Sequence, residues 1–191
     1  MRICCFDLAS RTGVAFGGVD AMPTIVAWPL RRAGQSTEFA VGNLGENLRD
    51  LFDLEQFDLV VAEEYLNPAA APSADAVISQ IMMHGCLEGI AKVYGIGVRR
   101  VPVATVRVHL CGKATAHPPR SKGSMPLSAR EKAKNREDTK AMVFKQCVAL
   151  GYFERGAKPD FDRADAAALF DFAAATYGRA RRPFALQGQT L

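Results

Sequence analysis

The sequence predicts an α/β fold in which a mixed five-stranded sheet, three antiparallel strands followed by parallel strands, is flanked by helices. Three short apolar segments lie within the first 30 residues and are joined by turn residues, which indicates an antiparallel meander. Beyond them, segments with helical apolar spacing alternate with short apolar strands, an order typical of parallel strands joined by helices. The 191 residues suit one core, so we expect a single domain over residues 1–178 and a tail, 179–191, with little to bury.

The first predicted strand is Arg2–Leu8, an apolar run rich in strand-forming residues that carries a charge at Asp7. Turn residues at 10–13 precede a second strand that begins at Val14, and Ile25–Leu30 is the third. Ser36 or Thr37 can cap a helix that reaches about Gln56, because apolar residues recur there at helical spacing.

The central part of the chain alternates between strand and helix. Asp58–Glu63 is a short apolar strand that ends in charge, and a helix is expected from Pro72 or Ser73 to about Tyr94. Gly85 and Gly89 lie four residues apart on that helix, so they allow either a close core contact or an interface with another chain.

The C-terminal half begins with a strand at Val98–Val103. Residues 112–128 mix Gly, Pro, Ser and Lys, which predicts a long basic loop. Two helices follow, at Ala129–Leu150 and Phe161–Tyr177, and the last is expected to stop at Gly178 in the usual C-terminal glycine position.

Composition excludes several classes of protein. No run approaches the roughly 20 apolar residues of a membrane span, and the N-terminus meets a charge too early for a signal peptide, so we expect a cytoplasmic protein without a membrane partner. The five cysteines are odd in number and form no C-x-x-C pair, which indicates reduced thiols. Between Arg99 and Lys145 there are 12 basic and 3 acidic residues, whereas the whole chain carries only +4. Such a basic section favours an anionic polymer as partner, although a solvated basic helix has the same composition.

Carboxylates lie at the ends of two predicted strands. Asp7 ends the first strand, and Glu63 and Glu64 end the fourth. A buried carboxylate without partners costs several kcal/mol, so each must be exposed, paired or bound to a metal. Because side chains alternate along a strand, only one of Glu63 and Glu64 can face the same way as Asp7, and the strand pattern alone does not choose between them.

Two further acids, Asp162 and Asp165, share a face in the first turns of the last predicted helix. An acid at a helix start also has a simple structural explanation, the helix dipole, and this applies more to Asp162 than to Asp165. A set of carboxylates without His or Cys selects a hard cation, Mg²⁺ or Mn²⁺. Two such ions suit the attack of water on a phosphodiester, so the pattern predicts a metal-dependent nuclease.

Three motifs, in order along the chain, resemble those of the RuvC-type Holliday-junction resolvases, especially divergent phage forms. The first is Ile3-Cys4-Cys5-Phe6-Asp7-Leu8-Ala9-Ser10-Arg11-Thr12-Gly13, similar to the first strand, catalytic Asp and Thr-Gly turn of that family. The second is Val61-Ala62-Glu63-Glu64-Tyr65, in which Glu63 matches the catalytic Glu. The third is Asp162-Arg163-Ala164-Asp165-Ala166, which resembles the closing D-x-x-D-A.

The resemblance implies a ribonuclease H-like fold and an endonuclease that resolves four-way DNA junctions. It implies a site for two Mg²⁺ ions, which Mn²⁺ would replace, built from Asp7, Glu63, Asp162 and Asp165, and it implies no nucleotide cofactor. It also implies a homodimer that uses the helix after Glu63, which moves Gly85 and Gly89 towards an interface. Leu66 and Tyr65 fall where the family places an apolar wedge at the junction.

The resemblance, together with the basic section, also marks residues for DNA binding: Arg107, Lys113, Arg120, Lys122, Lys132, Lys134 and Arg136. Two departures from the bacterial pattern concern the loops. The turn after Asp7 is shorter and reads Leu8-Ala9 where Pro-Gly is usual, and the loop at 112–128 is longer and more basic. A cleavage-sequence preference therefore does not follow from the resemblance.

Three other functions fit parts of the pattern. A nuclease of the same fold would act on other branched DNA, flaps or RNA–DNA hybrids. A DNA-junction-binding module without catalysis would be expected to lack a carboxylate, and none of the four is missing. Sugar kinases and actin-like ATPases share an Asp before a Ser/Thr-rich turn, but they need two such domains and roughly twice this length.

Overall fold

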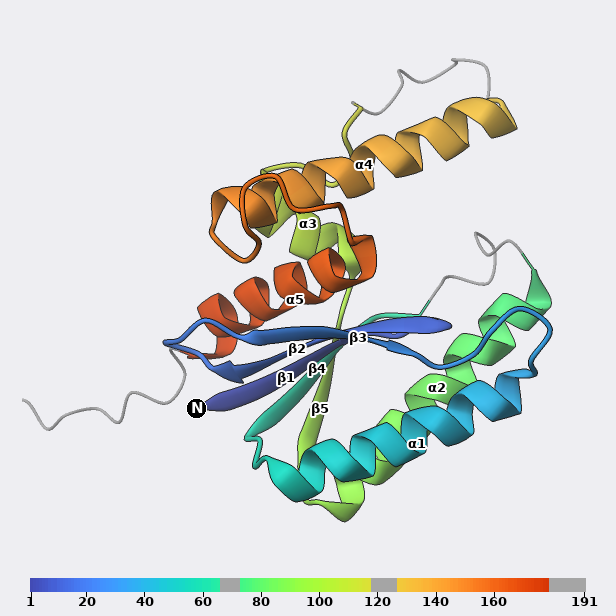
Figure 1. Ribbon diagram of the computed structural model, residues 1–191, viewed down its shortest axis with the longest axis vertical. Coiled ribbons are helices and arrows are strands. Elements are labelled where there is room, and N and C mark those ends of the chain that lie inside the picture. Colours follow the sequence, from blue (N-terminus) through green and yellow to red (C-terminus); the bar gives the residue numbers. More distant parts are fainter. Residues whose placement is uncertain (66–72, 118–126, 179–191) are drawn as a thin grey trace, which may run out of the picture.

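The computed structural model describes residues 1–65, 73–117 and 127–178, and these residues form a five-stranded sheet between two layers of helices (Figure 1). The strands are β1 (Arg2–Asp7), β2 (Arg11–Gly18), β3 (Thr24–Pro29), β4 (Leu59–Glu63) and β5 (Gly97–Val101). Their order across the sheet is β3-β2-β1-β4-β5. The pairs β1–β2 and β2–β3 are antiparallel, whereas β1–β4 and β4–β5 are parallel. The predicted mixed sheet is therefore confirmed.

Two helices, α1 (Thr37–Leu54) and α2 (Ala74–Val93), cover one face of the sheet (Figure 1). Both begin at a serine whose hydroxyl accepts a backbone N–H, Ser36 for α1 and Ser73 for α2, as expected of N-caps. Their buried apolar side chains share one core cluster with Cys4, Phe6 and neighbouring strand residues.

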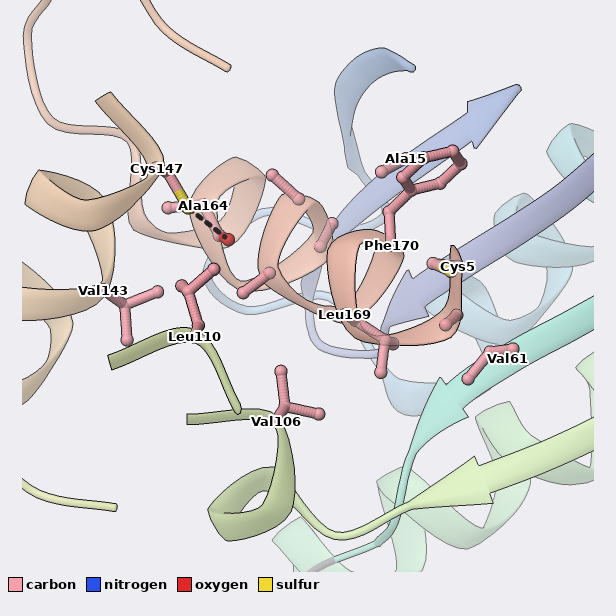
Figure 2. Packing of buried hydrophobic residues seen from close by; sticks show 14 of the residues in the cluster. Cys5, Ala15, Val61, Val106, Leu110, Val143, Cys147, Ala164, Leu169 and Phe170 are labelled. Atoms are coloured by element: carbon pink, nitrogen blue, oxygen red, sulfur yellow. Dashed lines mark hydrogen bonds between the residues drawn. The ribbon is translucent and has the colours of Figure 1, made fainter. Parts of the chain in front are cut away.

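The other face is covered by α5 (Phe161–Tyr177), with α3 (Val103–Cys111) and α4 (Ala129–Ala149) packed outside it (Figure 1). Figure 2 shows Phe170 of α5 beside Ala15 of β2, and Leu169 on the side of the helix nearer Val61 of β4. Five buried alanines let the helix approach both neighbours closely: Ala164, Ala166, Ala167, Ala168 and Ala173. Because α5 is enclosed between two layers, its start is held rigidly over the sheet.

Two expectations about local structure were wrong. Helix α3 was not predicted, because its valines favour strands and the preceding strand was extended to Val103; the strand instead ends at Val101, before Pro102. Gly178 ends α5 with φ −61°, so it is not a left-handed cap. A Cβ there would lie 3.1 Å from Val19, which explains the small residue by close packing.

The two glycines of α2 do not make a core contact. A Cβ added to Gly85 or Gly89 would meet no heavy atom within 4 Å, and both residues are exposed. Of their two predicted uses, a contact with the described residues of the same chain is therefore excluded. No helix of the described part of the chain is both long and apolar enough to span a membrane.

Candidate nuclease site at the sheet edge

Asp7 and Glu63 lie side by side where β1 and β4 end. The two strands are parallel, with Phe6 opposite Ala62, so the next residues on each strand are neighbours at the edge. Cys5 and Val61 belong to the core that faces α5, and alternation places Asp7 and Glu63 on that same face. Glu64 is exposed, and its backbone N–H donates to the Val101 carbonyl oxygen. The structure thus brings Glu63, and not Glu64, to Asp7.

Asp165 reaches this pair from the first turns of α5. Its side chain is buried, with 7% of the residue exposed, although it lies on a helix of otherwise apolar buried residues. No hydrogen bond or ion pair within the described residues compensates its charge. A buried carboxylate of this kind is costly to keep unless a cation neutralises it.

The three carboxylates Asp7, Glu63 and Asp165 form one electrostatic cluster. Burial, followed by repulsion from Asp165 and Asp162, raises the pKa of Asp7 from 3.8 to about 7. Burial and the charges of Asp7 and Asp165 raise the pKa of Glu63 well above its usual value, and burial raises that of Asp165. Adjacent acids with raised pKa values are typical of functional sites.

Asp162 differs from the other three acids because it forms an ion pair, although its charge still acts on Asp7 and Asp165. Its Oδ2 accepts a hydrogen bond from Arg11 Nη1 at 2.5 Å, and Arg11 also forms a two-pronged pair with Asp160, with both N–O distances 2.7 Å. Asp160 is the N-cap of α5, so Arg11 ties the start of that helix to the start of β2. Asp162 therefore already has a cationic partner, which sets it apart from Asp165.

Two basic side chains lie close to the carboxylate cluster, Arg107 from α3 and Lys140 from α4. The positive charges of both lower the pKa values of Asp7, Glu63 and Asp165. Arg107 was predicted from the sequence, and its buried Nε has no hydrogen-bond partner among the described residues. Lys140 was missed, because it lies where the basic start of α4 has already become apolar. The sequence did contain one indication of its role, because Lys140 follows Arg136 by one helical turn and so lies on the same face of the helix.

The other residues predicted to bind DNA lie farther from the acids or outside the described residues. Lys132, Lys134 and Arg136 are exposed in the first half of α4. Lys113 lies just after α3, where its Nζ donates to the Ala116 carbonyl oxygen. Arg120 and Lys122 fall outside the described residues.

Of the two predicted wedge residues, Tyr65 is described and Leu66 is not. Tyr65 lies two residues beyond Glu63 and is 40% exposed. Its hydroxyl accepts a hydrogen bond from Arg100 Nη1 at 2.9 Å, and the Arg100 guanidinium lies 4.7 Å from its ring centroid. The buried His84 ring packs against the Tyr65 ring in a T-shaped arrangement, with the two ring centroids 5.3 Å apart. Tyr65 is therefore an aromatic group fixed by Arg100 of β5 and His84 of α2, and these contacts do not include the acidic cluster.

The donor set fits a hard divalent cation in its chemistry. Within residues 1–65, 73–117 and 127–178, no three Asp, Glu, His or Cys side chains are arranged as a ready-made metal site. Asp7, Glu63 and Asp165 nonetheless supply only oxygen ligands, as Mg²⁺ and Mn²⁺ prefer. A cation among them would also relieve the repulsion that raises their pKa values.

Similarity to known proteins is confined to structure. No family model matches the chain, and no curated protein matches it in sequence. The structure of Thermus thermophilus RuvC matches with a TM-score of 0.61 and 15% identity, covering 94% of this chain and 96% of RuvC. The chain has the ribonuclease H-like fold of RuvC. T. thermophilus RuvC in complex with a Holliday junction substrate matches similarly, with a TM-score of 0.60 and 16% identity over 95% of this chain and 96% of that chain.

Proposed function

We propose that this chain is a metal-dependent endonuclease that resolves four-way DNA junctions. The observation that carries the proposal is the cluster of Asp7, Glu63 and Asp165, whose pKa values are raised, at the edge of a RuvC-like sheet. The match to RuvC bound to a Holliday junction supports branched DNA as the substrate. The basic first half of α4 supplies charge for contacts with phosphates.

Asp7, Glu63 and Asp165 would hold Mg²⁺ or Mn²⁺, two ions in the complete site, with Asp162 as a further ligand or a residue that orients water. The metal supplies activation of water and stabilisation of the leaving oxygen. Arg107 and Lys140 bind the scissile phosphate and neutralise its charge at the acidic site. The ion pair between Asp162 and Arg11 limits the movement of the Asp162 carboxylate towards a cation.

The test compares cleavage of a four-way junction, a linear duplex, a flap and an RNA–DNA hybrid with Mg²⁺ or Mn²⁺. Paired, symmetric nicks on the junction alone support the proposal. Cleavage of the flap or hybrid in preference to the junction would replace it with another ribonuclease H-like nuclease. Junction binding without cleavage in either metal would indicate a binding module.

Lys140→Gln is expected to slow junction cleavage by about a hundredfold, because it removes a cation that faces both the carboxylates and the phosphate. Binding of Mn²⁺ should be at least as tight as in the wild type, since one repulsive charge is lost. Single-turnover cleavage and calorimetric titration with Mn²⁺ separate the two effects. Lys145→Gln, an exposed lysine on the same helix, is the control. Equal cleavage by the Lys140→Gln variant and the wild type would remove Lys140 from the site.

The outer face of α2 supports a homodimer as part of the proposal. Ile78 and Ile81 are 52% and 53% exposed, and the open positions of Gly85 and Gly89 continue the same face of the helix. A contiguous apolar and small-residue stripe of this kind is typical of an interface between two helices.

Ile81→Arg is expected to convert the dimer into monomers, because a buried unpaired charge would raise the dimer dissociation constant by about a hundredfold or more. Analytical ultracentrifugation over a range of concentrations measures this change. Leu54→Arg adds the same charge at a highly exposed apolar residue at the end of α1, outside the α2 stripe, and should leave the dimer intact. A wild-type chain that sediments as a monomer at all concentrations would exclude this interface.

A further inference from the structure

A second basic site lies at the same edge of the sheet, on the side away from β5. We infer that Arg31 and Arg32, in the loop between β3 and α1, bind a phosphodiester group of the DNA strand that occupies the carboxylate site. This inference rests on the proposed function for the identity of the ligand. Neither arginine was among the residues predicted to bind DNA.

Arg31 is a partly buried cation that lacks an acidic partner. Its Nε donates to Ser10 Oγ at 3.0 Å, and its Nη1 donates to Thr37 Oγ1 at 3.2 Å. Within the described residues no carboxylate forms an ion pair with it, whereas Arg2, Arg11 and Arg100 each pair with acids. The two neutral hydroxyls fix the guanidinium in place without forming an ion pair with it, and the nearby acids Glu38 and Asp75 line a separate pocket that also includes Arg31. A positioned guanidinium of this kind is suited to an anion with several oxygen atoms.

The space in front of Arg31 is a cavity of about 420 Å³ without acidic residues in its lining. It is lined by Ser10, Arg31, Arg32, Ala33, Gly34 and Gln35. A closed turn shapes it: the Arg32 N–H donates to Gln35 Oε1 at 2.6 Å, and the Gln35 N–H donates to the Arg32 carbonyl oxygen at 3.2 Å. Gly34 adopts φ +86°, which favours glycine there. The loop therefore presents two arginines from a defined backbone.

Backbone hydrogen bonds connect the loop that lines this cavity to the turn that follows Asp7. The backbone N–H groups of Leu30 and Arg31 both donate to the Ser10 carbonyl oxygen, at 2.9 and 3.3 Å, and Ser10 is three residues after Asp7. β3 lies two strands from β1, which is about 10 Å across a sheet. At a rise of roughly 3.4 Å per nucleotide, a strand whose scissile phosphate lies at Asp7 would reach the cavity about three nucleotides away.

The experiment measures binding of a fluorescent four-way junction and of a linear duplex over a range of salt concentrations, without divalent metal. Arg31→Gln is expected to weaken binding about tenfold and to reduce the slope of log affinity against log salt by about one, as for one lost phosphate contact. Arg32→Gln should give a smaller loss. Arg31→Lys keeps the charge and should recover most of the slope. Arg49→Gln, on α1 about 18 Å further along the helix, is the control of equal charge.

A second measurement locates the contact on the DNA. A single neutral methylphosphonate, moved along the strand near the cleavage position, should weaken wild-type binding at one place about three nucleotides from the scissile phosphate. The same substitution should have no effect on the Arg31→Gln variant.

The outcomes separate the cavity from the proposed function. If Arg31→Gln folds, shown by an unchanged melting temperature, and binds both DNAs with the wild-type affinity and slope, the phosphate site is wrong while junction resolution stands. If the wild type shows no preference for the junction but Arg31→Gln still weakens duplex binding, the phosphate site stands and junction resolution fails. A wild-type protein that binds neither DNA overturns both.

Discussion

Asp7→Asn is expected to abolish DNA cleavage, by about a thousandfold or more, and to stabilise the metal-free protein. The loss follows because Asp7 belongs to the candidate metal site with Glu63 and Asp165, and metal ions contribute several kcal/mol to such reactions. Junction binding should remain largely intact, since contacts with phosphates supply most of the affinity.

The stabilisation follows from the raised pKa of Asp7, which moves from 3.8 to about 7 in the folded protein. Between these two values the folded state holds a proton that the unfolded state has released, so stability falls as pH rises. The ionised Asp7 carboxylate therefore destabilises the folded protein. This effect is absent below about pH 4 and complete above about pH 7, where it lowers the free energy of unfolding by roughly 2–4 kcal/mol. Asparagine carries no charge, so the variant should lose this part of the pH dependence.

Melting temperatures at pH 5 and pH 8, with and without Mg²⁺, measure the effect. The metal-free wild type should be less stable at pH 8 than at pH 5, and Mg²⁺ should restore stability at pH 8. The Asp7→Asn variant should melt higher than the wild type at pH 8 without metal and respond less to Mg²⁺. Asp50→Asn, an exposed acid on α1, is the control. An Asp7→Asn variant that cleaves at the wild-type rate would show that the site is assigned wrongly.

The acidic cluster was accessible from the sequence because strand ends and helix starts are local patterns. Asp7 and Glu63 each follow a short apolar run, and Asp165 precedes an alanine-rich packing surface. The choice of Glu63 over Glu64 needed either the resemblance or the parallel pairing of β1 with β4, because alternation along one strand does not show which face is covered. The face became known only when α5 was seen to pack there.

The residues whose roles could not be predicted from the sequence depend on contacts between segments that are far apart in the chain. Arg11 is 149 residues from Asp160, and no local pattern reports that pair. Lys140 acts on Asp7 only because α4 packs against α5. Arg31 was passed over because its hydroxyl partners, Ser10 and Thr37, belong to two other segments. Helix α3 was missed because its valines have strand propensity, which the packing of Val106 and Leu110 overrides.

Gly13→Ala is expected to displace the start of α5 and to destabilise the protein by about 3 kcal/mol or more. Gly13 pairs with Asp7 in the sheet, and a Cβ there would lie 1.9 Å from the carbonyl oxygen and 2.7 Å from the carbonyl carbon of Asp162. Both atoms belong to the backbone of α5, so a side-chain rotation cannot relieve the clash. The helix start must move, and with it the distance from Asp165 to Asp7.

The expected result is a melting temperature lower by roughly 10 °C, together with a loss of cleavage. Gly18→Ala is the matched control, because Gly18 lies in the same strand and a Cβ there would meet no atom within 4 Å. It should fold and cleave like the wild type. A Gly13→Ala variant with the same melting temperature and activity as Gly18→Ala would contradict the close contact between β2 and α5. That contact is what carries Asp162 and Asp165 of α5 to the strand that holds Asp7, so its loss would remove the structural basis of the site.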